Sequence, residues 1–366
     1  MVRGARAQGE RVGHNDTVND AQTTSENIEL VPLQEDDSTR RIPIISWRLI
    51  TAVLAALAMV AILFWIPVPF VVNSPGPTFN VLGSDNGVPM LQIEGTDPVT
   101  GEPIQQDEPQ SSSYDAPAKP GHGQLRMVTV SESGAPDSRL NFAQLIAAYF
   151  DPHSKILDYE SVYPAGTTRQ QVSDAQLAMM RNSQTTSQVA ALEYLGWDVP
   201  ATITIEGAVE GSNAEGNVEQ GDILRAITTP DGVRHEITSA ATPFAIMRSV
   251  PAGSTMTLTV ERGGTTQDVS FDSVAASATE TGSKLGVYLS ADPVLPVDIT
   301  VNIDGVGGPS AGMMFSLSII DRLTPGDMTG GNVIAGTGTM SYDGQVGAIG
   351  GIQQKLWGAH RDGAQW

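Results

Sequence analysis

The chain has 366 residues, of which 20 are Lys or Arg and 41 are Asp or Glu, so its formal net charge at pH 7 is −21. Such a polyanion lacks the cationic side chains that neutralise phosphates, which excludes nucleic-acid binding as its main function. The absence of cysteine excludes disulfides, iron–sulfur clusters, thiolate zinc sites and a cysteine nucleophile. No G-x-x-x-x-G-K-[ST] phosphate loop is present, which excludes a conventional P-loop ATPase.

The N-terminal part is predicted to be a polar tail followed by a membrane anchor. Residues 1–44 are polar with few aromatic residues, which is typical of a disordered segment. Residues 49–66 are apolar except for Thr51, and the segment 45–72 is long enough to cross ~30 Å of hydrocarbon as a helix. The tail is too long for the n-region of a cleavable signal peptide. No polar stripe marks the segment as a soluble core helix.

The charges on the two sides of this segment predict its orientation. Arg40, Arg41 and Arg48 lie just before the apolar run at 49–66, whereas the next Lys or Arg after it is Lys119. By the positive-inside rule, the tail is cytoplasmic and residues 73–366 are extracytoplasmic. We therefore expect a single-pass protein of the cell membrane.

Residues 73–199 are expected to form an extracytoplasmic loop and a mixed α/β segment. Within this segment, residues 83–123 are rich in Gly, Pro, Asp, Ser and Gln and are predicted to be a solvated loop. A strand is predicted after it at 124–131, and helices are predicted at 141–150 and 170–195. The Met179–Met180 pair on the second helix is most simply interpreted as core packing.

Residues 200–272 have the pattern of a separate small module. Alternating apolar residues predict strands at 203–205 and 256–260. Between them lie the turn GSNA at 211–214 and a Gly-Asp pair at 221–222 that opens an apolar strand. This pattern resembles a PDZ domain, and the resemblance implies capture of an extended peptide as an added strand. A β-rich spacer without peptide binding is the alternative.

The segment after Leu295 has the order strand, tight turn and helix. Residues 297–303 alternate as a strand, the turn has the sequence GVGGPSAG, and residues 313–320 are mostly apolar. This order places Ser310 at a helix N-terminus, whose unpaired N–H groups and positive dipole suit a developing oxyanion. A serine hydroxyl becomes a nucleophile only when a base removes its proton.

Lys355 is the candidate base. It is the only lysine after Ser310, and it lies on a predicted helix that follows the glycine pair at 350–351. A lysine can act as a base when apolar surroundings lower its pKa. Histidines are less suitable, because His14 lies on the other side of the membrane. The next three lie upstream in loops or in the PDZ-like module, at His122, His153 and His235.

The C-terminal segment resembles the proteolytic domain of Lon-type proteases, which are Ser–Lys peptidases. The resemblance rests on GPSAG at 308–312, DMTGG at 327–331, AGTGT at 335–339 and GQVGAIGGIQQK at 344–355, in matching order. The order of anchor, PDZ-like module and Lon-like domain resembles the membrane-anchored, ATPase-free members found in Gram-positive bacteria. We therefore expect an α+β protein whose Lon-like peptidase domain occupies residues 280–366.

The resemblance also implies roles for individual residues. Ser310 would be the nucleophile, Lys355 the general base, and Thr337 the residue that orients the lysine amine. No metal and no cofactor is implied. Backbone N–H groups of the turn would form the oxyanion hole, at Gly308, Pro309 and Ala311.

Two features depart from the family pattern. Many Lon proteases carry an acidic residue three positions before the serine, whereas this chain has Gly307, for which Asp304 is a weak substitute. The family also continues past the lysine helix with another strand and helix, whereas this chain ends at Trp366. The sequence therefore predicts a truncated peptidase domain.

Two other functions are open on the sequence. The motif G-x-S-x-G is also the nucleophile elbow of α/β-hydrolases, with Asp343 and His360 as candidate partners of Ser310. The residues after Ser310 are too few for the βα units that such a fold requires. The second alternative is a membrane-anchored PDZ scaffold with an inactive peptidase domain.

The favoured function is an ATP-independent, membrane-anchored serine endopeptidase. Without an ATPase to unfold them, its substrates are expected to be unfolded or loosely folded proteins near the membrane. The PDZ-like module would deliver such chains to the serine. A homo-oligomeric ring is suggested by the resemblance alone.

Overall fold

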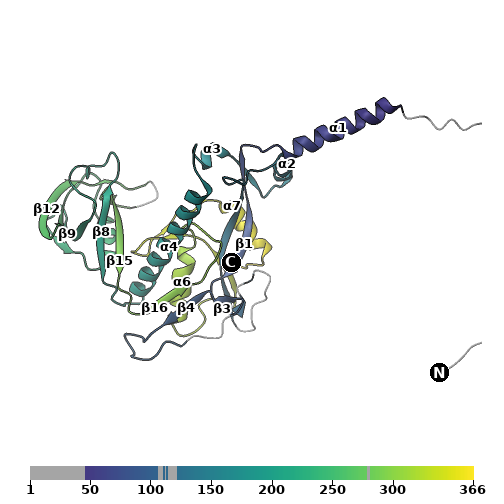
Figure 1. The fold of residues 1–366 in the computed structure, drawn as a ribbon. Coiled ribbons are helices and arrows are strands. Elements are labelled where there is room, and N and C mark those ends of the chain that lie inside the picture. The colour runs from purple at the N-terminus through teal and green to yellow at the C-terminus, as the bar shows by residue number, and fades with distance from the viewer. Residues whose placement is uncertain (1–45, 106–109, 112, 114–121, 278–280) are drawn as a thin grey trace, which may run out of the picture. The chain divides into compact units, whose positions relative to one another are not determined.

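The computed structural model describes residues 46–105, 110–111, 113, 122–277 and 281–366 (Figure 1). The predicted disordered tail at 1–44 lies outside these residues, as does part of the predicted loop at 83–123. The chain is α+β, as expected. The helices are α1 Trp47–Trp65, α2 Phe142–Phe150, α3 Tyr159–Val162, α4 Arg169–Tyr194, α5 Thr242–Met247, α6 Gly312–Leu323 and α7 Ile352–Arg361.

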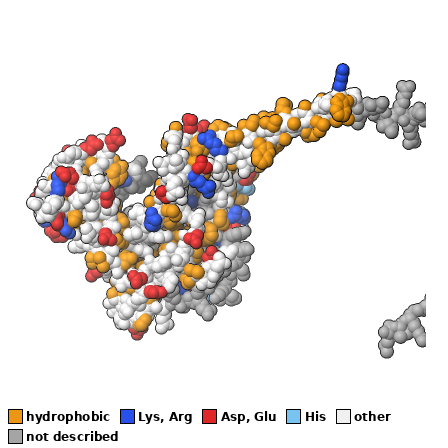
Figure 2. All heavy atoms as spheres, in the orientation of Figure 1, with side chains coloured by type: hydrophobic (Ala, Val, Ile, Leu, Met, Phe, Trp, Pro, Cys, Tyr) orange, Lys and Arg blue, Asp and Glu red, His pale blue; other side chains and the backbone are white. Residues whose placement is uncertain are grey.

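Helix α1 has the length and composition needed to cross a bilayer. Its 19 residues are apolar except at two positions near its start, Arg48 and Thr51, and none of them is buried. Figure 2 shows hydrophobic side chains along the helix. Among the described residues, no other helix is both long and apolar enough to span a membrane.

A four-stranded sheet carries the candidate site. Its order is β17–β6–β1–β7, with β1 antiparallel to β6 and β7, and β17 parallel to β6. Three of the strands precede the PDZ-like module and the fourth follows it. Their bounds are β1 Phe70–Asn80, β6 Gln124–Ser133, β7 Lys155–Asp158 and β17 Val333–Gly336. The sheet is therefore assembled from two separate parts of the chain.

Helices from both parts of the chain pack around this sheet. Helix α4 packs against α6, and α7 packs against β1 and β6. Met127 of β6, Met180 of α4 and Phe315 of α6 are all buried in one core cluster. The residues that pack with the predicted peptidase domain at 280–366 therefore begin at β1, far upstream of the predicted boundary.

The PDZ-like module is a second sheet of order β12–β11–β9–β8–β15, with β10 paired to β9. The module extends beyond its predicted end at 272. Strand β15 belongs to it because this strand pairs along β8, with Ala201 opposite Pro293. Val294 N then donates to Pro200 O at 2.7 Å. The strands are β8 Ala201–Ala208, β9 Asp222–Thr228, β10 Arg234–Glu236, β11 Thr255–Arg262, β12 Thr265–Asp272 and β15 Val287–Pro293.

Short strands replace part of the loop predicted at 83–123. Strand β4 pairs antiparallel with β16, and its Leu91 and Ile93 are only 3% and 2% exposed. The prediction of a solvated loop is wrong for β4, because two buried residues are too short a pattern to stand out among glycines and prolines. The remaining strands are β2 Gly83–Asp85, β3 Val88–Pro89, β4 Leu91–Glu94, β5 Gln110–Ser111, β13 Val274–Ala275, β14 Ser283–Lys284, β16 Asp298–Val301, β18 Thr339–Met340 and β19 Val346–Gly347.

The strongly periodic segments folded as predicted. Helices α2, α4, α6 and α7 and strands β6, β8, β11 and β16 lie where the sequence places them. Helix α4 begins with a capping box in which Thr168 and Gln171 satisfy each other's backbone N–H groups. Core packing is confirmed for Met180, which is 4% exposed, and is wrong for Met179, which is 41% exposed.

Candidate active site

Ser310 lies in the turn between β16 and α6, two residues before the helix begins at Gly312. The chain reverses at Gly308, whose φ of +87° is strained for a residue with a side chain. The Ser310 carbonyl accepts two hydrogen bonds, from Gly338 N and from Thr337 Oγ1, both at 3.0 Å. These bonds fix the serine backbone against the segment that follows β17.

The side chains of Ser310, Thr337 and Lys355 meet at this turn. Lys355 Nζ lies 2.8 Å from Ser310 Oγ and 2.9 Å from Thr337 Oγ1. Because the Thr337 hydroxyl proton is donated to the Ser310 carbonyl, this hydroxyl can only accept from the lysine. The structure thus brings together the three side chains to which the sequence assigned catalytic roles.

Lys355 is buried without a countercharge. Its residue is 5% exposed, and among the described residues it forms no ion pair with a carboxylate. Burial disfavours the charged amine and lowers the pKa of Lys355 from 10.5 to about 8. With this pKa, about a tenth of the amine is neutral at pH 7 and about half at pH 8.

Close packing of α7 on the sheet holds Lys355 in place. The helix starts at Gly351, whose φ is +67° and where a Cβ would lie 2.6 Å from Val130 Cγ2 of β6. At Gly358 a Cβ would lie 2.8 Å from the Gly76 carbonyl of β1. Just beyond the helix, Asp362 accepts a hydrogen bond from Thr78 N at 2.9 Å. Both strands that position α7 precede the PDZ-like module.

The predicted oxyanion hole needs a correction. Pro309 has no backbone N–H and cannot donate. The Gly308 N–H already donates to the Gln176 carbonyl of α4 at 3.2 Å. Within the part of the chain that the structure describes, the N–H groups of Ser310 and Ala311 donate to no acceptor. Ser310 N and Ala311 N are therefore the donors available to a developing oxyanion.

Gln176 of α4 occupies the space beside Gly307, the position where the resemblance led us to look for an acidic side chain. At Gly307 a Cβ would lie 2.5 Å from Gln176 Oε1 and 2.7 Å from Gln176 Cβ. Any side chain at this position would have to displace Gln176. Asp304, the weak substitute, is exposed and makes no hydrogen bond or ion pair to Ser310 or Lys355 in the described structure.

The structure does not bring together the residues of the hydrolase alternative. Asp343 pairs with Arg248 and accepts from Ser341, and His360 is exposed on α7. Among the described residues, neither side chain hydrogen-bonds to Ser310. The Ser-Asp-His arrangement is therefore absent from this part of the chain.

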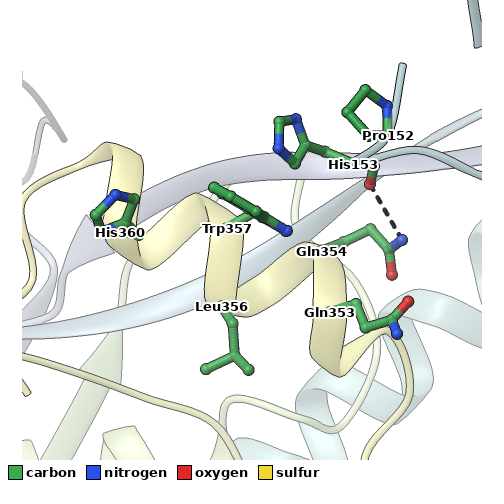
Figure 3. A pocket seen from close by; sticks show the side chains of 7 residues that line it. All are labelled: Pro152, His153, Gln353, Gln354, Leu356, Trp357 and His360. Carbon is green, nitrogen blue, oxygen red and sulfur yellow. Dashed lines mark hydrogen bonds between the residues drawn. The ribbon is translucent and has the colours of Figure 1, made fainter. Parts of the chain in front are cut away.

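An open cavity of about 530 Å³ lies on the outer side of α7 (Figure 3). The rings of His153 and Trp357 meet there at an angle of 59°, with centroids 3.9 Å apart, and Gln354 Nε2 donates to His153 O at 3.2 Å. Neither Ser310 nor Lys355 lines the cavity, so it is separate from the candidate active site. Its lining residues are Pro152, His153, Gln353, Gln354, Leu356, Trp357 and His360.

Residues 248–365 match the family model of the Lon protease (S16) C-terminal proteolytic domain. Ser310, Thr337 and Lys355 all lie within this match, which begins upstream of the predicted domain start at 280. No curated protein matches the chain.

Two solved structures are similar to part of the chain. The PDZ domain of an SdrC-like protein from Listeria innocua is 18% identical, with a TM-score of 0.21, and the match covers 24% of this chain and 92% of that one. The corresponding domain from Listeria monocytogenes is 15% identical, with a TM-score of 0.21 and coverages of 24% and 85%. The motifs and the geometry around Ser310 thus lie in the segment that is similar to the Lon protease (S16) C-terminal proteolytic domain.

Proposed function

We propose that this chain is a membrane-anchored serine endopeptidase that works without ATP, with Ser310 as nucleophile and Lys355 as general base. The observation that carries the proposal is the 2.8 Å separation between Lys355 Nζ, which is buried, and Ser310 Oγ. A buried amine with a pKa of about 8 has a substantial neutral fraction near neutral pH, which a base requires.

In the acylation step, neutral Lys355 takes the proton from Ser310 Oγ while this oxygen attacks the substrate's peptide carbonyl. A C–O bond forms, and the carbonyl oxygen becomes an oxyanion that the N–H groups of Ser310 and Ala311 stabilise. The Lys355 ammonium then gives its proton to the amine of the leaving segment as the C–N bond breaks. The acyl group remains on Ser310.

In the deacylation step, a water molecule attacks the acyl carbon and neutral Lys355 takes the water's proton. Collapse of the second oxyanion breaks the bond to Ser310 Oγ, which regains a proton from the lysine. The new C-terminal carboxylic acid leaves. One lysine thus acts alternately as base and acid in both half-reactions.

Thr337 has the hydrogen-bonding pattern of a positioning residue. Its hydroxyl proton is committed to the Ser310 carbonyl, so the hydroxyl accepts one lysine N–H. When the amine is neutral, this contact leaves the nitrogen lone pair free to accept the Ser310 hydroxyl proton. Thr337 would therefore orient the base without touching the substrate.

The rest of the chain supports a substrate class rather than a particular substrate. A chain without a phosphate loop cannot use ATP through one to unfold a stable protein, so we propose unfolded or loosely folded proteins as substrates. Helix α1 would anchor the protein with its N-terminal tail in the cytoplasm. The four-stranded sheet with α4, α6 and α7, which we call the catalytic unit, would lie outside. The PDZ-like module would bind extended segments of these substrates.

The test is cleavage of an unfolded model protein by the full chain in detergent, without ATP. Ser310→Ala and Lys355→Ala should each lower kcat by about 10³–10⁶-fold, because both groups act in one step. Lys155→Ala, which changes an exposed lysine of β7, is the matched control and should leave kcat unchanged. Activity that survived Lys355→Ala would overturn the proposed dyad. An inactive unmodified chain would favour the scaffold alternative.

A further inference from the structure

Helix α2 presents four apolar side chains that the other described residues leave partly or largely exposed. Phe142, Ile146, Tyr149 and Phe150 are 39%, 38%, 76% and 78% exposed, and we call them the α2 apolar face. Their spacing of i, i+4, i+7 and i+8 puts them on one side of the helix. The rings of Tyr149 and Phe150 pack edge to face, with centroids 5.4 Å apart.

The side of α2 next to this face packs against the rest of the chain. Leu145 and Ala148 pack against a core cluster built on Val68, Val72 and Leu140, so the helix has a fixed orientation. In a capping box, the side chains of Asn141 and Gln144 each accept a hydrogen bond from the other residue's backbone N–H. The apolar face is therefore a stable surface rather than a frayed end.

The start of α2 is hydrogen-bonded to the chain that leaves α1. Val68 N donates to Leu140 O at 2.8 Å, and Pro67 forms a β-bridge with Asn141. Helix α1 ends at Trp65, and consecutive Cα atoms are about 3.8 Å apart, so Pro67 lies within about 8 Å of the end of the span. This limit follows from chain connectivity alone. If α1 crosses the membrane, α2 begins at the membrane surface.

The composition of α2 fits a lipid interface better than an electrostatic contact. The nine residues FAQLIAAYF contain no charged side chain. Aromatic side chains such as Phe and Tyr are favoured where hydrocarbon meets headgroups. Arg139, just before the helix, is placed over the Tyr159 ring at 4.1 Å. A chain with a net charge of −21 gains little from anionic lipid, so attraction to the bilayer must come from apolar contact.

We propose that the α2 apolar face inserts into the outer interface of the lipid bilayer beside the exit of α1. This inference rests on the membrane anchoring proposed above. Insertion of this face would give the catalytic unit a second attachment to the membrane, in addition to α1. Because the turn after α2 contacts α7 through His153 and Gln354, the attachment also reaches the helix that carries Lys355.

The test measures the depth of single fluorophores in the full chain. The sequence contains no cysteine, so one introduced thiol can be labelled with the fluorophore NBD. Phe150→Cys reports on the α2 apolar face and Leu57→Cys on the span. Tyr194→Cys is the matched control, because this tyrosine is 77% exposed at the end of α4. Tyr149→Cys provides a second position on α2 if Phe150→Cys does not fold.

Each labelled protein is placed in phosphatidylcholine vesicles with and without doxyl-labelled phosphatidylcholine, which quenches only fluorophores in contact with lipid. We expect quenching at positions 57 and 150 to be several-fold stronger than at 194. Salt should not change this result, because the α2 apolar face carries no charge. Cleavage of an unfolded protein in the same samples shows separately whether the variants are folded and active.

The other outcomes show whether the inference about α2 or the membrane anchoring by α1 is wrong. Quenching at position 57 but not at 150 would overturn the inference and leave the anchor intact. Absence of quenching at position 57 would overturn the anchoring on which it rests. Blue-shifted emission at 150 without doxyl quenching would mean that protein, such as a second copy of the chain, covers the α2 apolar face. That result would also overturn the inference.

Discussion

The proposed mechanism depends on one amine, that of Lys355, whose charge is disfavoured by its surroundings. Lys355 is buried between α7 and the sheet, and its described neighbours include two hydroxyl groups but no carboxylate partner. Burial lowers the pKa of this lysine to about 8. Because the neutral form would be the active base, the protonation of Lys355 should affect both activity and stability.

The first prediction concerns the pH profile of kcat/KM. Activity should rise with pH as Lys355 loses its proton and should level off above an apparent pKa near 8. The measurement is initial-rate cleavage of an unfolded substrate between pH 5.5 and 9.5, a range chosen to bracket about one and a half units on either side of the expected pKa. A profile that levelled off near the ordinary histidine pKa of about 6.5 would point to a histidine base instead.

The second prediction concerns stability. Below about pH 8 both the folded and unfolded states hold the lysine proton, so the folded state carries a buried charge. Between pH 8 and 10.5 this lysine holds its proton more in the unfolded state, so its contribution to the free energy of unfolding rises with pH. Lys355→Met should therefore raise the free energy of unfolding at pH 7 by about 1–3 kcal/mol while abolishing cleavage.

Thermal unfolding of Lys355→Met and of the unmodified chain at pH 7 and pH 10 measures this effect. The gain should shrink at the higher pH, where the unmodified chain no longer buries a charge. Lys155→Met, at an exposed position, should change the free energy of unfolding by less than about 0.5 kcal/mol at both pH values. A destabilised Lys355→Met protein would contradict the prediction.

The third prediction separates orientation from chemistry at Thr337. Thr337→Val keeps the shape of the side chain but removes the hydroxyl that accepts from Lys355, so kcat should fall about 10–100-fold with little change in KM. Thr337→Ser restores the hydroxyl and should recover most of the rate. A rise in KM alone would mean that Thr337 contributes to substrate binding rather than to the position of the base.

At the scale of elements, the PDZ-like module contacts the hairpin that follows Thr337. Arg248, at the end of α5, pairs with Asp343 between β18 and β19 and also donates to the Asp343 carbonyl at 3.1 Å. The rings of Phe244 and Tyr342 lie 5.9 Å apart beside this pair. A displacement of α5 would therefore be transmitted to this hairpin, which begins two residues after Thr337.

The fourth prediction follows from this contact. Arg248→Ala leaves the Asp343 carboxylate, whose side chain is 5% exposed, without its cation. We expect a loss of about 1–2 kcal/mol in the free energy of unfolding and a fall in kcat, because the hairpin also positions Thr337. Arg225→Ala, which breaks the exposed pair with Glu261, is the control and should cost less than about 1 kcal/mol. Equal effects of the two substitutions would contradict a special role for the Arg248 contact.

The sequence predicted the elements that carry strong local patterns. The GPSAG motif predicted the turn at Ser310 and the start of α6. The glycine pair at 350–351 predicted the start of α7. The oxyanion donors could not be predicted, because the bond between Gly308 N and the Gln176 carbonyl joins residues that are far apart in the chain. Strand β4 was missed because its only signal is Leu91 and Ile93. Pro309 could have been excluded as an oxyanion donor from the sequence, because proline has no backbone N–H.

At the scale of the whole molecule, the catalytic unit is discontinuous. Strands β1, β6 and β7 and helix α4 come before the PDZ-like module, and β16, α6, β17 and α7 come after it. The predicted domain at 280–366 followed the order of motifs in the chain. Sequence order could not show that β17 pairs with β6 or that Gly358 of α7 rests on Gly76 of β1.

The fifth prediction is that the segment matching the Lon family does not fold by itself. Expressed alone, residues 248–366 lack β1, β6 and α4, which leaves Phe315 and Lys355 without their covering layers. Hydrogen exchange should show little protection in this fragment. Supplying residues 67–247 as a second chain should increase the protection. A protected fragment with a cooperative unfolding transition would contradict the prediction.

The chain enters and leaves the PDZ-like module at neighbouring positions. Ala201 lies opposite Pro293 on neighbouring strands, and Val294 N donates to Pro200 O at 2.7 Å. Neighbouring strands bring paired Cα atoms to within about 5.5 Å, a gap that a tight turn can close. The backbone therefore enters and leaves the module side by side, so an exchange of the module would need to replace only the packing that it shares with α4 and α6, where Ile203 and Ile319 lie in one core cluster.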